Sequence, residues 1–429
     1  GSGVITDVNS PNTTITGMTP GVTVVAWTVS NGPCANGITS DQLVITLYDQ
    51  NNPLANAGAD QELCTPTGTT TNTTLQGSSI IFPAQGTWTL VGGTGNITDP
   101  NDPNTAVDGL SIGENLFLWT VTNGVCNDPI TTDLVSIFVF DENNPDAVAG
   151  PSQQICTPVT NAFMAGSSIT FPAVGTWTLV SGQGTIVDAN DPLTEITDLG
   201  LGVNVFEWTV DNGACPNGIT TDQVTLVLFD AQAPPADAGP DQELCAPDDS
   251  AVLVANPPVG AAFGTWTILQ GSGSVADENN PNTTVSGMEV GETILTWTLS
   301  SGVCVTTVDS VSIFVFDPNN PIANAGLDQE LCVPQDSVFM AGSNLIFPAQ
   351  GTWTLVSGTG TPVAPNDPGT LISGLSVGQN VFQWEVYNGP CANSLTSDQV
   401  TITLFSDSTS AANAGPDLET CIPLTAVQL

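Results

Sequence analysis

Residues 206–215 read Phe-Glu-Trp-Thr-Val-Asp-Asn-Gly-Ala-Cys, and this stretch decides the fold. Phe206, Trp208 and Val210 alternate with polar residues, which is the two-residue period of a β-strand with one buried face. The Asn-Gly pair that follows tolerates the positive φ angles of a tight hairpin turn. We therefore predict a strand that places Trp208 in a core, then a hairpin that carries a cysteine.

Close variants of this phrase recur along the chain at intervals of 87 to 92 residues. The hairpin cysteines are Cys34, Cys126, Cys215, Cys304 and Cys391. A second set ends phrases like Ala-Gly-x-Asp-Gln-Glu-Leu-Cys and comprises Cys64, Cys156, Cys245, Cys332 and Cys421. Between the two sets lie a Gly-Thr-Trp-Thr phrase and the strand tryptophan. The tryptophans predicted to form the cores are Trp88, Trp119, Trp177, Trp208, Trp266, Trp297, Trp353 and Trp384.

The period predicts tandem domains. The predicted bounds are 1–50 for the C-terminal part of a repeat, then 51–142, 143–231, 232–318 and 319–406 for complete repeats, and 407–429 for the N-terminal part of a further one. About seven short strands per repeat, without sustained helical periodicity, predict an all-β fold of two-sheet immunoglobulin-like (PKD-like) sandwiches of about 89 residues. Short proline-containing linkers predict an elongated rod, on the order of 40 Å per repeat.

Both ends of the sequence fall inside a repeat, which we interpret as a window on a longer array. An alternative is that partial repeats of separate chains complete one another by strand donation. That alternative is incomplete, because neither partial repeat contains the Gly-Thr-Trp-Thr strand that a whole sandwich needs.

The charge of the chain limits its function. It has 42 acidic residues and no Lys, Arg or His, yet 40% of its residues are hydrophobic, which suffices for apolar cores. Without cations it cannot neutralise nucleic-acid phosphates or form internal salt bridges. No apolar run reaches the roughly 18 residues that span a membrane. The missing His and Lys also remove the usual general bases, so we predict that this segment is not an enzyme.

Ten cysteines indicate an oxidising compartment. A disulfide needs Cα atoms within about 7 Å, and we place the first strand of a sandwich next to the last hairpin of the same sandwich. The expected pairs are Cys64–Cys126, Cys156–Cys215, Cys245–Cys304 and Cys332–Cys391, with Cys34 and Cys421 left over. The alternative pairs Cys34 with Cys64, and so on across each linker, but the last strand runs about a dozen residues away from its hairpin.

Acidic loops recur between and within the repeats, and two interpretations are open. Clustered carboxylate and amide oxygens suit calcium, for which the candidate ligands are Asp99, Asp102, Asp141, Asp188, Asp191 and Asp317. Alternatively, Asp and Asn cap turns. No other cofactor is expected.

The phrases at 238–245 and 119–126, together with Gly-Thr-Trp-Thr, resemble the PKD-like or immunoglobulin-like repeats of giant surface proteins of Bacteroidota. These include the gliding-motility adhesins of flavobacteria, which are exported by type IX secretion. The resemblance implies a place outside the bacterial outer membrane and anchoring through a region beyond this chain. It also implies O-glycosylation at Asp-Ser-apolar sites, here Ser250, Ser310 and Ser337, with Ser408 a looser match.

We therefore expect a non-catalytic extracellular stalk or filament segment of a large cell-surface adhesin, which gives reach for attachment or gliding. Its partners would be other repeats of the same protein and an unknown surface or glycan target. The alternatives are that the repeats themselves bind glycans or proteins, or that they are subunits of a polymeric filament. Exposed aromatic residues at equivalent positions of every repeat would favour binding, whereas a polar and acidic surface would favour a spacer.

Overall fold

The computed structural model describes residues 1–407, 412–420, 426 and 428, and its regular elements there are all β-strands. Residues 1–50 form β1 (Val4–Ile5), β2 (Ile15–Thr16), β3 (Gly21–Ser30) and β4 (Ile38–Leu47). Residues 51–142 form β5 (Gln61–Thr65), β6 (Thr71–Thr74), β7 (Gln85–Gly92), β8 (Asn96–Ile97), β9 (Ala106–Leu110), β10 (Gly113–Thr122) and β11 (Ile130–Asp141). Residues 143–231 form β12 (Gln153–Cys156), β13 (Ala162–Phe163), β14 (Val174–Ser181), β15 (Thr185–Ile186), β16 (Glu195–Thr197), β17 (Gly202–Asp211) and β18 (Ile219–Phe229).

The later repeats have the same strands in the same order. Residues 232–318 form β19 (Gln242–Cys245), β20 (Ala251–Val254), β21 (Phe263–Gln270), β22 (Ser274–Val275), β23 (Asn282–Ser286), β24 (Gly291–Ser300) and β25 (Thr306–Phe316). Residues 319–406 form β26 (Gln329–Cys332), β27 (Ser337–Phe339), β28 (Gln350–Ser357), β29 (Thr361–Pro362), β30 (Leu371–Ser373), β31 (Gly378–Tyr387) and β32 (Leu395–Phe405). The chain divides into two compact units, Gly1–Phe229 and Asp230–Leu429, and each contains two complete sets of sheets.

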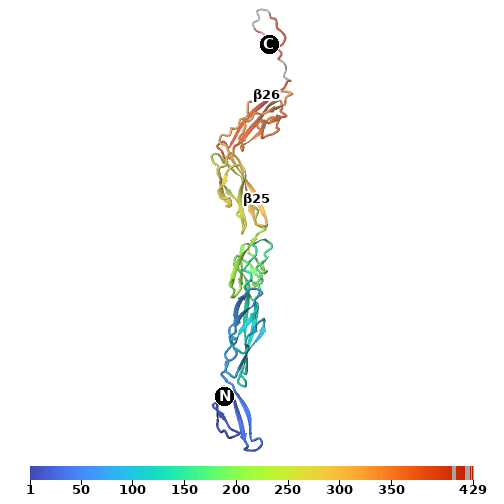
Figure 1. Cartoon of the computed structure of the whole chain (residues 1–429). Coiled ribbons are helices and arrows are strands. Elements are labelled where there is room, and N and C mark those ends of the chain that lie inside the picture. The colour runs from blue at the N-terminus through green and yellow to red at the C-terminus, as the bar shows by residue number, and fades with distance from the viewer. Residues whose placement is uncertain (408–411, 421–425, 427, 429) are drawn as a thin grey trace. The chain divides into compact units, whose positions relative to one another are not determined.

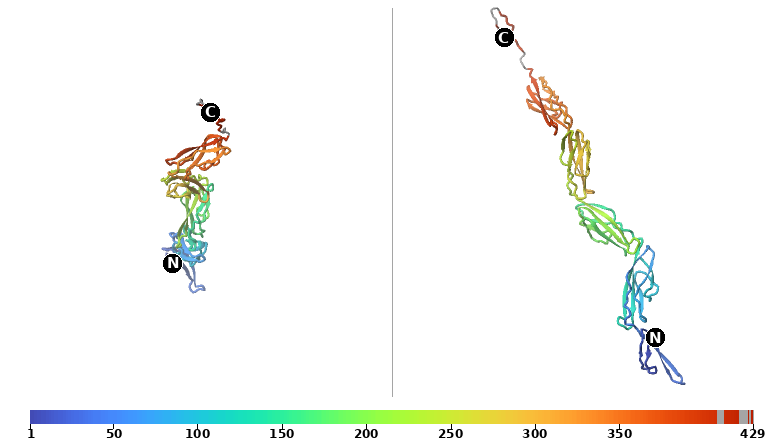
Figure 2. Two further views of the ribbon diagram at one scale, coloured as in Figure 1. Left: turned by 90° about the horizontal axis from the view of Figure 1, so that it is seen from above. Right: turned by 90° about the vertical axis from the view of Figure 1, so that its left-hand side faces the viewer.

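Each complete repeat consists of a four-stranded and a three-stranded sheet (Figure 1). In the first of them the orders are β5-β11-β10-β7 and β6-β9-β8, and the other three repeat this pattern. The first strand, β5, lies parallel to the last strand, β11, whereas the other neighbours are antiparallel. Figure 2 shows the chain from two further directions, and the sandwiches can be told apart in its right-hand view. The chain is thus an array of tandem immunoglobulin-like β-sandwiches, as the sequence predicted.

Two tryptophan rings form the centre of each sandwich. Trp177 on β14 pairs in register with Trp208 on β17, and their ring centroids are 5.0 Å apart. A β-carbon at Gly175 would overlap the Trp208 ring, which explains the glycine of the Gly-Thr-Trp-Thr phrase. All eight predicted core tryptophans are buried, at 2% exposure or less: Trp88, Trp119, Trp177, Trp208, Trp266, Trp297, Trp353 and Trp384.

A buried asparagine ties the strand of the second tryptophan to the loop after the first. Asn204 lies on the core face of β17, and its Oδ1 accepts the Gln183 N–H at 2.7 Å. Its Nδ2 donates to the Gly200 carbonyl at 2.8 Å, so both ends of the buried amide are satisfied. Asn115 and Asn380 repeat this arrangement, and Thr293 takes the place in the remaining repeat.

Aspartate carboxylates hold the beginning of each repeat on its last strand. Asp222 on β18 accepts the Ala149 N–H at 2.8 Å, and Asp133 accepts the Ala57 N–H at 2.7 Å. These bonds satisfy backbone donors of a segment that belongs to no sheet. In this role a negative side chain stabilises the fold without any cation.

Residues 1–50 form two two-stranded sheets, β1-β2 and β3-β4. Strand β3 pairs with β4, but none of the described residues forms a Gly-Thr-Trp-Thr strand beside it. Trp27, the equivalent of Trp119, is consequently 42% exposed. It lines an open cavity of about 700 Å³ together with apolar residues such as Ile15 and Met18.

The tryptophan pair gives a stability prediction. Trp208→Ala should lower the free energy of unfolding of its repeat by about 3–5 kcal/mol, because it deletes a fully buried aromatic ring. Trp27→Ala is the matched control and should lower the free energy of unfolding by less than Trp208→Ala does, because the Trp27 side chain is already 42% exposed. Denaturant titration followed by circular dichroism measures both. Equal losses for the two variants would contradict the central place of the ring pair.

Candidate functional site: the joint between repeats

The Asn-Gly hairpins of three repeats lie against the linker that precedes the repeat, and we call this region the joint. Asn212 Nδ2 donates to the carbonyl of Asp141, at the end of the previous repeat's last strand, at 2.9 Å. Asn123 makes the same bond to Asp49 at 2.8 Å, and Asn388 makes it to Asp317 at 3.0 Å. The asparagine therefore both shapes its own turn and binds the neighbouring repeat.

The glycine of the hairpin receives an aromatic ring from the previous repeat. A β-carbon at Gly213 would overlap the ring of Phe140, the penultimate residue of β11. In the same way Gly124 faces Tyr48, and Gly389 faces Phe316. Gly213 also has a φ of 50°, so both its conformation and its surroundings favour glycine.

Apolar contacts close the joint around this ring. Phe140, Ala173 and Cys215 are buried together, with Phe138 and Ile169 packed against them. In the unit Asp230–Leu429, Phe316 is 3% exposed and meets the Tyr387 ring edge-on, with centroids 6.0 Å apart. The Tyr387 hydroxyl donates to the Glu243 carboxylate, and this hydrogen bond is the main cause that raises the pKa of Tyr387.

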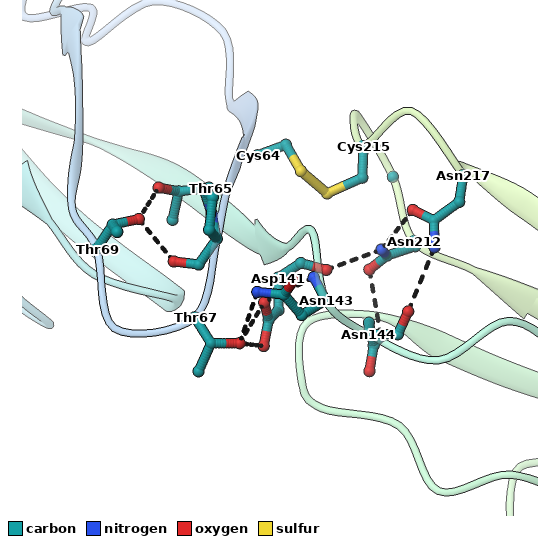
Figure 3. The surroundings of a disulfide bond; sticks show 12 residues. Cys64, Thr65, Thr67, Thr69, Asp141, Asn143, Asn144, Asn212, Cys215 and Asn217 are labelled. Atoms are coloured by element: carbon teal, nitrogen blue, oxygen red, sulfur yellow. Dashed lines mark hydrogen bonds between the residues drawn. A yellow bond between two sulfur atoms is a disulfide. The ribbon is translucent and has the colours of Figure 1, made fainter.

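A disulfide crosses each of two joints. Cys64, at the end of the first strand of one repeat, bonds to Cys215 in the hairpin of the next (Figure 3). Cys245 bonds to Cys391 in the same way. The Cα atoms lie 5.0 and 5.1 Å apart, within the ordinary range for a disulfide. Cys156 and Cys304 are also disulfide-bonded.

The pairing expected within repeats is therefore wrong. Cys126 and Cys332 are free, while Cys64, Cys215, Cys245 and Cys391 have partners in neighbouring repeats. These bonds exclude all four expected pairs: Cys64–Cys126, Cys156–Cys215, Cys245–Cys304 and Cys332–Cys391. The alternative across each linker is wrong too, because Cys34 is free and Cys64 bonds elsewhere. Cys421 lies outside the described residues.

The direction of the first strand explains the error. The chain passes the hairpin end of the sandwich before Cys64, where the Ala55 N–H donates to Thr131 Oγ1 at 2.8 Å. It then runs parallel to β11, so that Cys64 lies beside Phe140 at the opposite end. About ten strand residues at about 3.3 Å each separate Cys64 from its own hairpin by roughly 33 Å. The next repeat's hairpin is the one within reach.

A polar network surrounds the Cys64–Cys215 joint (Figure 3). Thr67 Oγ1 donates to the Asp141 carboxylate at 2.7 and 2.8 Å. Asn144 Nδ2 donates to Asn212 Oδ1 at 3.2 Å, and Asn217 Nδ2 reaches the Asn144 carbonyl at 3.3 Å. The linker therefore has partners in both repeats that it connects.

The aspartates predicted as calcium ligands cap turns. Each accepts the backbone N–H two residues further along the chain, at 2.8 to 3.0 Å; they are Asp99, Asp102, Asp141, Asp188, Asp191 and Asp317. Across the described ranges no three acidic or cysteine side chains lie close enough together to hold a metal ion. The geometry therefore supports the turn-capping alternative and gives calcium no support.

The predicted glycosylation sites differ in accessibility. Ser250 precedes β20 and is exposed, Ser310 is exposed on β25, and Ser337 is half-buried at the start of β27. Ser408 lies outside the described residues. Glycosylation at these serines stays a prediction.

No family model matches the chain. Among curated proteins it is similar to "Dyslexia-associated protein KIAA0319 homolog" of Rattus norvegicus, 26% identical over 260 residues, which are 57% of this chain and 24% of the relative. The human protein "Dyslexia-associated protein KIAA0319" is 26% identical over 262 residues, 58% of this chain and 24% of the relative. The chain thus spans about a quarter of the length of these relatives.

Solved structures of two repeat types are also similar. "Sidekick-1 immunoglobulin domains 1-5" has 11% identity and a TM-score of 0.27, over 90% of this chain and 96% of that one. "Solution structure of the PKD domain from KIAA 1837 protein" has 24% identity and a TM-score of 0.18, over 21% of this chain and 92% of that one. The strand pairing described above establishes the fold of this chain independently of these likenesses.

The disulfide connectivity can be checked by peptide mapping. Digestion of the unreduced chain by a protease specific for Asp or Glu should yield a linked pair of peptides containing Cys64 and Cys215, identified by mass spectrometry. The pair should separate on reduction. A linked Cys64–Cys126 pair would instead restore the arrangement within one repeat.

The fit of the ring to the glycine gives a second prediction. Gly213→Ala should lower the free energy of unfolding by about 1–2 kcal/mol because of the positive φ at this position. Overlap of the new methyl group with Phe140 should lower it by about 1–3 kcal/mol more. Gly260→Ala is the control, because Gly260 has a φ of 65° and no atom within 4 Å of the added carbon. Denaturant titration of Gly260→Ala should show only the loss in free energy of unfolding that the positive φ causes. An equal cost in both variants would mean that the ring does not constrain the hairpin.

Proposed function

We propose that this chain is a non-catalytic extracellular spacer, a stalk segment of a large repetitive cell-surface adhesin. The observation that carries the proposal is the joint. Two features that recur along the chain, the Asn-Gly-x-Cys hairpin and the aromatic residue before the linker, connect one repeat to the next. A chain whose repeated residues serve to join its modules is suited to giving length.

The compartment follows from chemistry. Disulfides persist in oxidising surroundings and are rare in the cytosol, so the bonded cysteines are typical of an extracellular protein. No helix in the described residues has the length and apolar character needed to cross a bilayer. The bacterial outer surface, type IX secretion and a role in gliding motility rest on the resemblance of the repeat phrases to Bacteroidota adhesins.

Exposed aromatic residues give some support to the alternative that the repeats bind a glycan or a protein. Phe163 and Phe339 occupy equivalent strand positions and are 65% and 70% exposed. The other two complete repeats have Thr74 and Val252 there, so the feature is not shared by all. The phenylalanines of a recurring Phe-Pro phrase, Phe82, Phe171 and Phe347, are exposed as well. Phe171 lies at a joint, beside Phe138 and Phe140. The spacer remains the better supported function.

Small-angle X-ray scattering of the whole chain tests the spacer. Repeats of roughly 40 Å joined end to end should give a radius of gyration of about 50 Å, whereas a compact domain of this length has about 22 Å. The value should not change at 1 M salt, because the joints contain apolar contacts, hydrogen bonds and disulfides. A radius near the compact value would refute the spacer.

A glycan array probed with the same chain tests the alternative. We expect no specific binding. Binding that is lost in a Phe163→Ala, Phe339→Ala double variant would favour recognition by the repeats themselves.

A further inference from the structure

We infer that the disulfides across the joints form a covalent bypass: a pulling force on the chain passes through the disulfide bonds and does not act on the residues between the bonded cysteines, which make up most of each sandwich. The inference deepens the proposed function, because a stalk that attaches a cell to a surface is pulled at both ends. The bypass itself depends only on which cysteines are bonded, so it can be tested apart from the spacer role.

The positions of the bonded cysteines define the path of the force in the unit Gly1–Phe229. Cys64 lies at the end of β5, the first strand of its repeat, and Cys215 lies just before β18, the last strand of the following repeat. The bond spans a sequence separation of 151. Tension that enters along the chain before Cys64 therefore crosses to Cys215 and leaves along β18. The residues between them form a closed loop that the pull cannot straighten.

The unit Asp230–Leu429 has the same disulfide connectivity. Cys245 ends β19, the first strand of its repeat, and Cys391 precedes β32, the last strand of the next repeat. Here the sequence separation is 146. Two separate pairs of repeats are thus closed in the same way, so the bypass is a property of the joint.

The two loops contain the parts on which the sandwiches depend. The first encloses Trp88, Trp119, Trp177 and Trp208, and the second encloses Trp266, Trp297, Trp353 and Trp384. All eight rings are buried, and each pair joins the edge strand of the four-stranded sheet to its neighbouring central strand. A pull on the oxidised chain cannot separate these strands by straightening the backbone.

The strands outside the loops are those that a pull can detach. β5 is held on β11 by parallel pairing, and β18 is held on β17 by a long antiparallel ladder. If both strands and the segments next to them detached, they would supply roughly 30 extended residues. At about 3.5 Å per residue, the chain outside the loop would lengthen by about 100 Å in this unit. The roughly 150 residues inside the loop correspond to about 500 Å of contour length, which the pull cannot extend while the disulfide is intact.

Single-molecule force spectroscopy on the whole chain, held by tags at its two ends, measures the bypass directly. The oxidised chain should reach a contour length far below the roughly 1500 Å expected for 429 extended residues. Dithiothreitol should then restore the full length. Each disulfide takes two electrons and two protons and becomes two cysteine thiols, while dithiothreitol becomes its cyclic disulfide. An oxidised chain that extends as far as the reduced one would overturn the inference.

A double variant assigns the effect to one joint. Without reductant, Cys64→Ala, Cys215→Ala should lengthen the chain by hundreds of ångström, but by less than the roughly 500 Å of the whole loop, because Cys156 inside the loop keeps its own disulfide. Cys126→Ala is the control: Cys126 is free, so the curve should match that of the original chain. A double variant with the original contour length would refute the assignment.

Should the double variant fail to fold, the original chain still decides the question. Held at constant force, it should lengthen in steps of several hundred ångström only after dithiothreitol is added, because the strands outside the loops allow about 100 Å in each unit before reduction. The outcome is separable from the spacer proposal. An extended chain in scattering without a bypass would leave the spacer intact, and a compact chain with a bypass would leave the disulfide circuit intact.

Discussion

The contact between two tryptophan rings across one strand pair is the interaction on which each repeat depends. The rings fill the space between the sheets and lie in register, and a glycine leaves room for the second ring. Around them the chain has no cation with which to neutralise its 42 acidic residues. Apolar burial and backbone hydrogen bonds must therefore supply the stability that other domains supplement with ion pairs.

The carboxylates nevertheless have defined structural roles. Asp222 and its equivalents hold the first segment of a repeat, while Asp99, Asp188 and others close turns by accepting a backbone N–H. A carboxylate that accepts an N–H at the surface keeps this hydrogen bond while water solvates its other lone pairs. The high negative charge is thus compatible with a compact fold, because each such aspartate stabilises the backbone next to it.

The sequence was sufficient for the sandwich and insufficient for the joint. Alternation around Trp208 identified the buried face, because a strand with one wet side leaves that pattern in any single repeat. The cysteine pairing failed because it depends on the direction of the strand that ends at Cys64, and a strand of four or five residues does not reveal whether it runs parallel or antiparallel to its neighbour.

The second role of the hairpin glycine was also hidden, for a related reason. Gly213 reads as a turn residue, and the ring that it accommodates belongs to another repeat. One signal was present in the sequence: an aromatic residue stands just before each linker, at Tyr48, Phe140 and Phe316, and an Asn-Gly or similar pair follows in every repeat. Two features that recur together at a fixed distance can be partners even when each has a sufficient local explanation.

The separation of the bonded cysteines also sets an order of maturation. When Cys64 leaves the ribosome, its partner is 151 positions away and has not yet been made. The thiol must remain reduced or exchangeable until the following module has been synthesised and its hairpin has folded against the waiting end. Every such bond thus requires that both modules it joins are present and that the downstream hairpin lies against the upstream strand end.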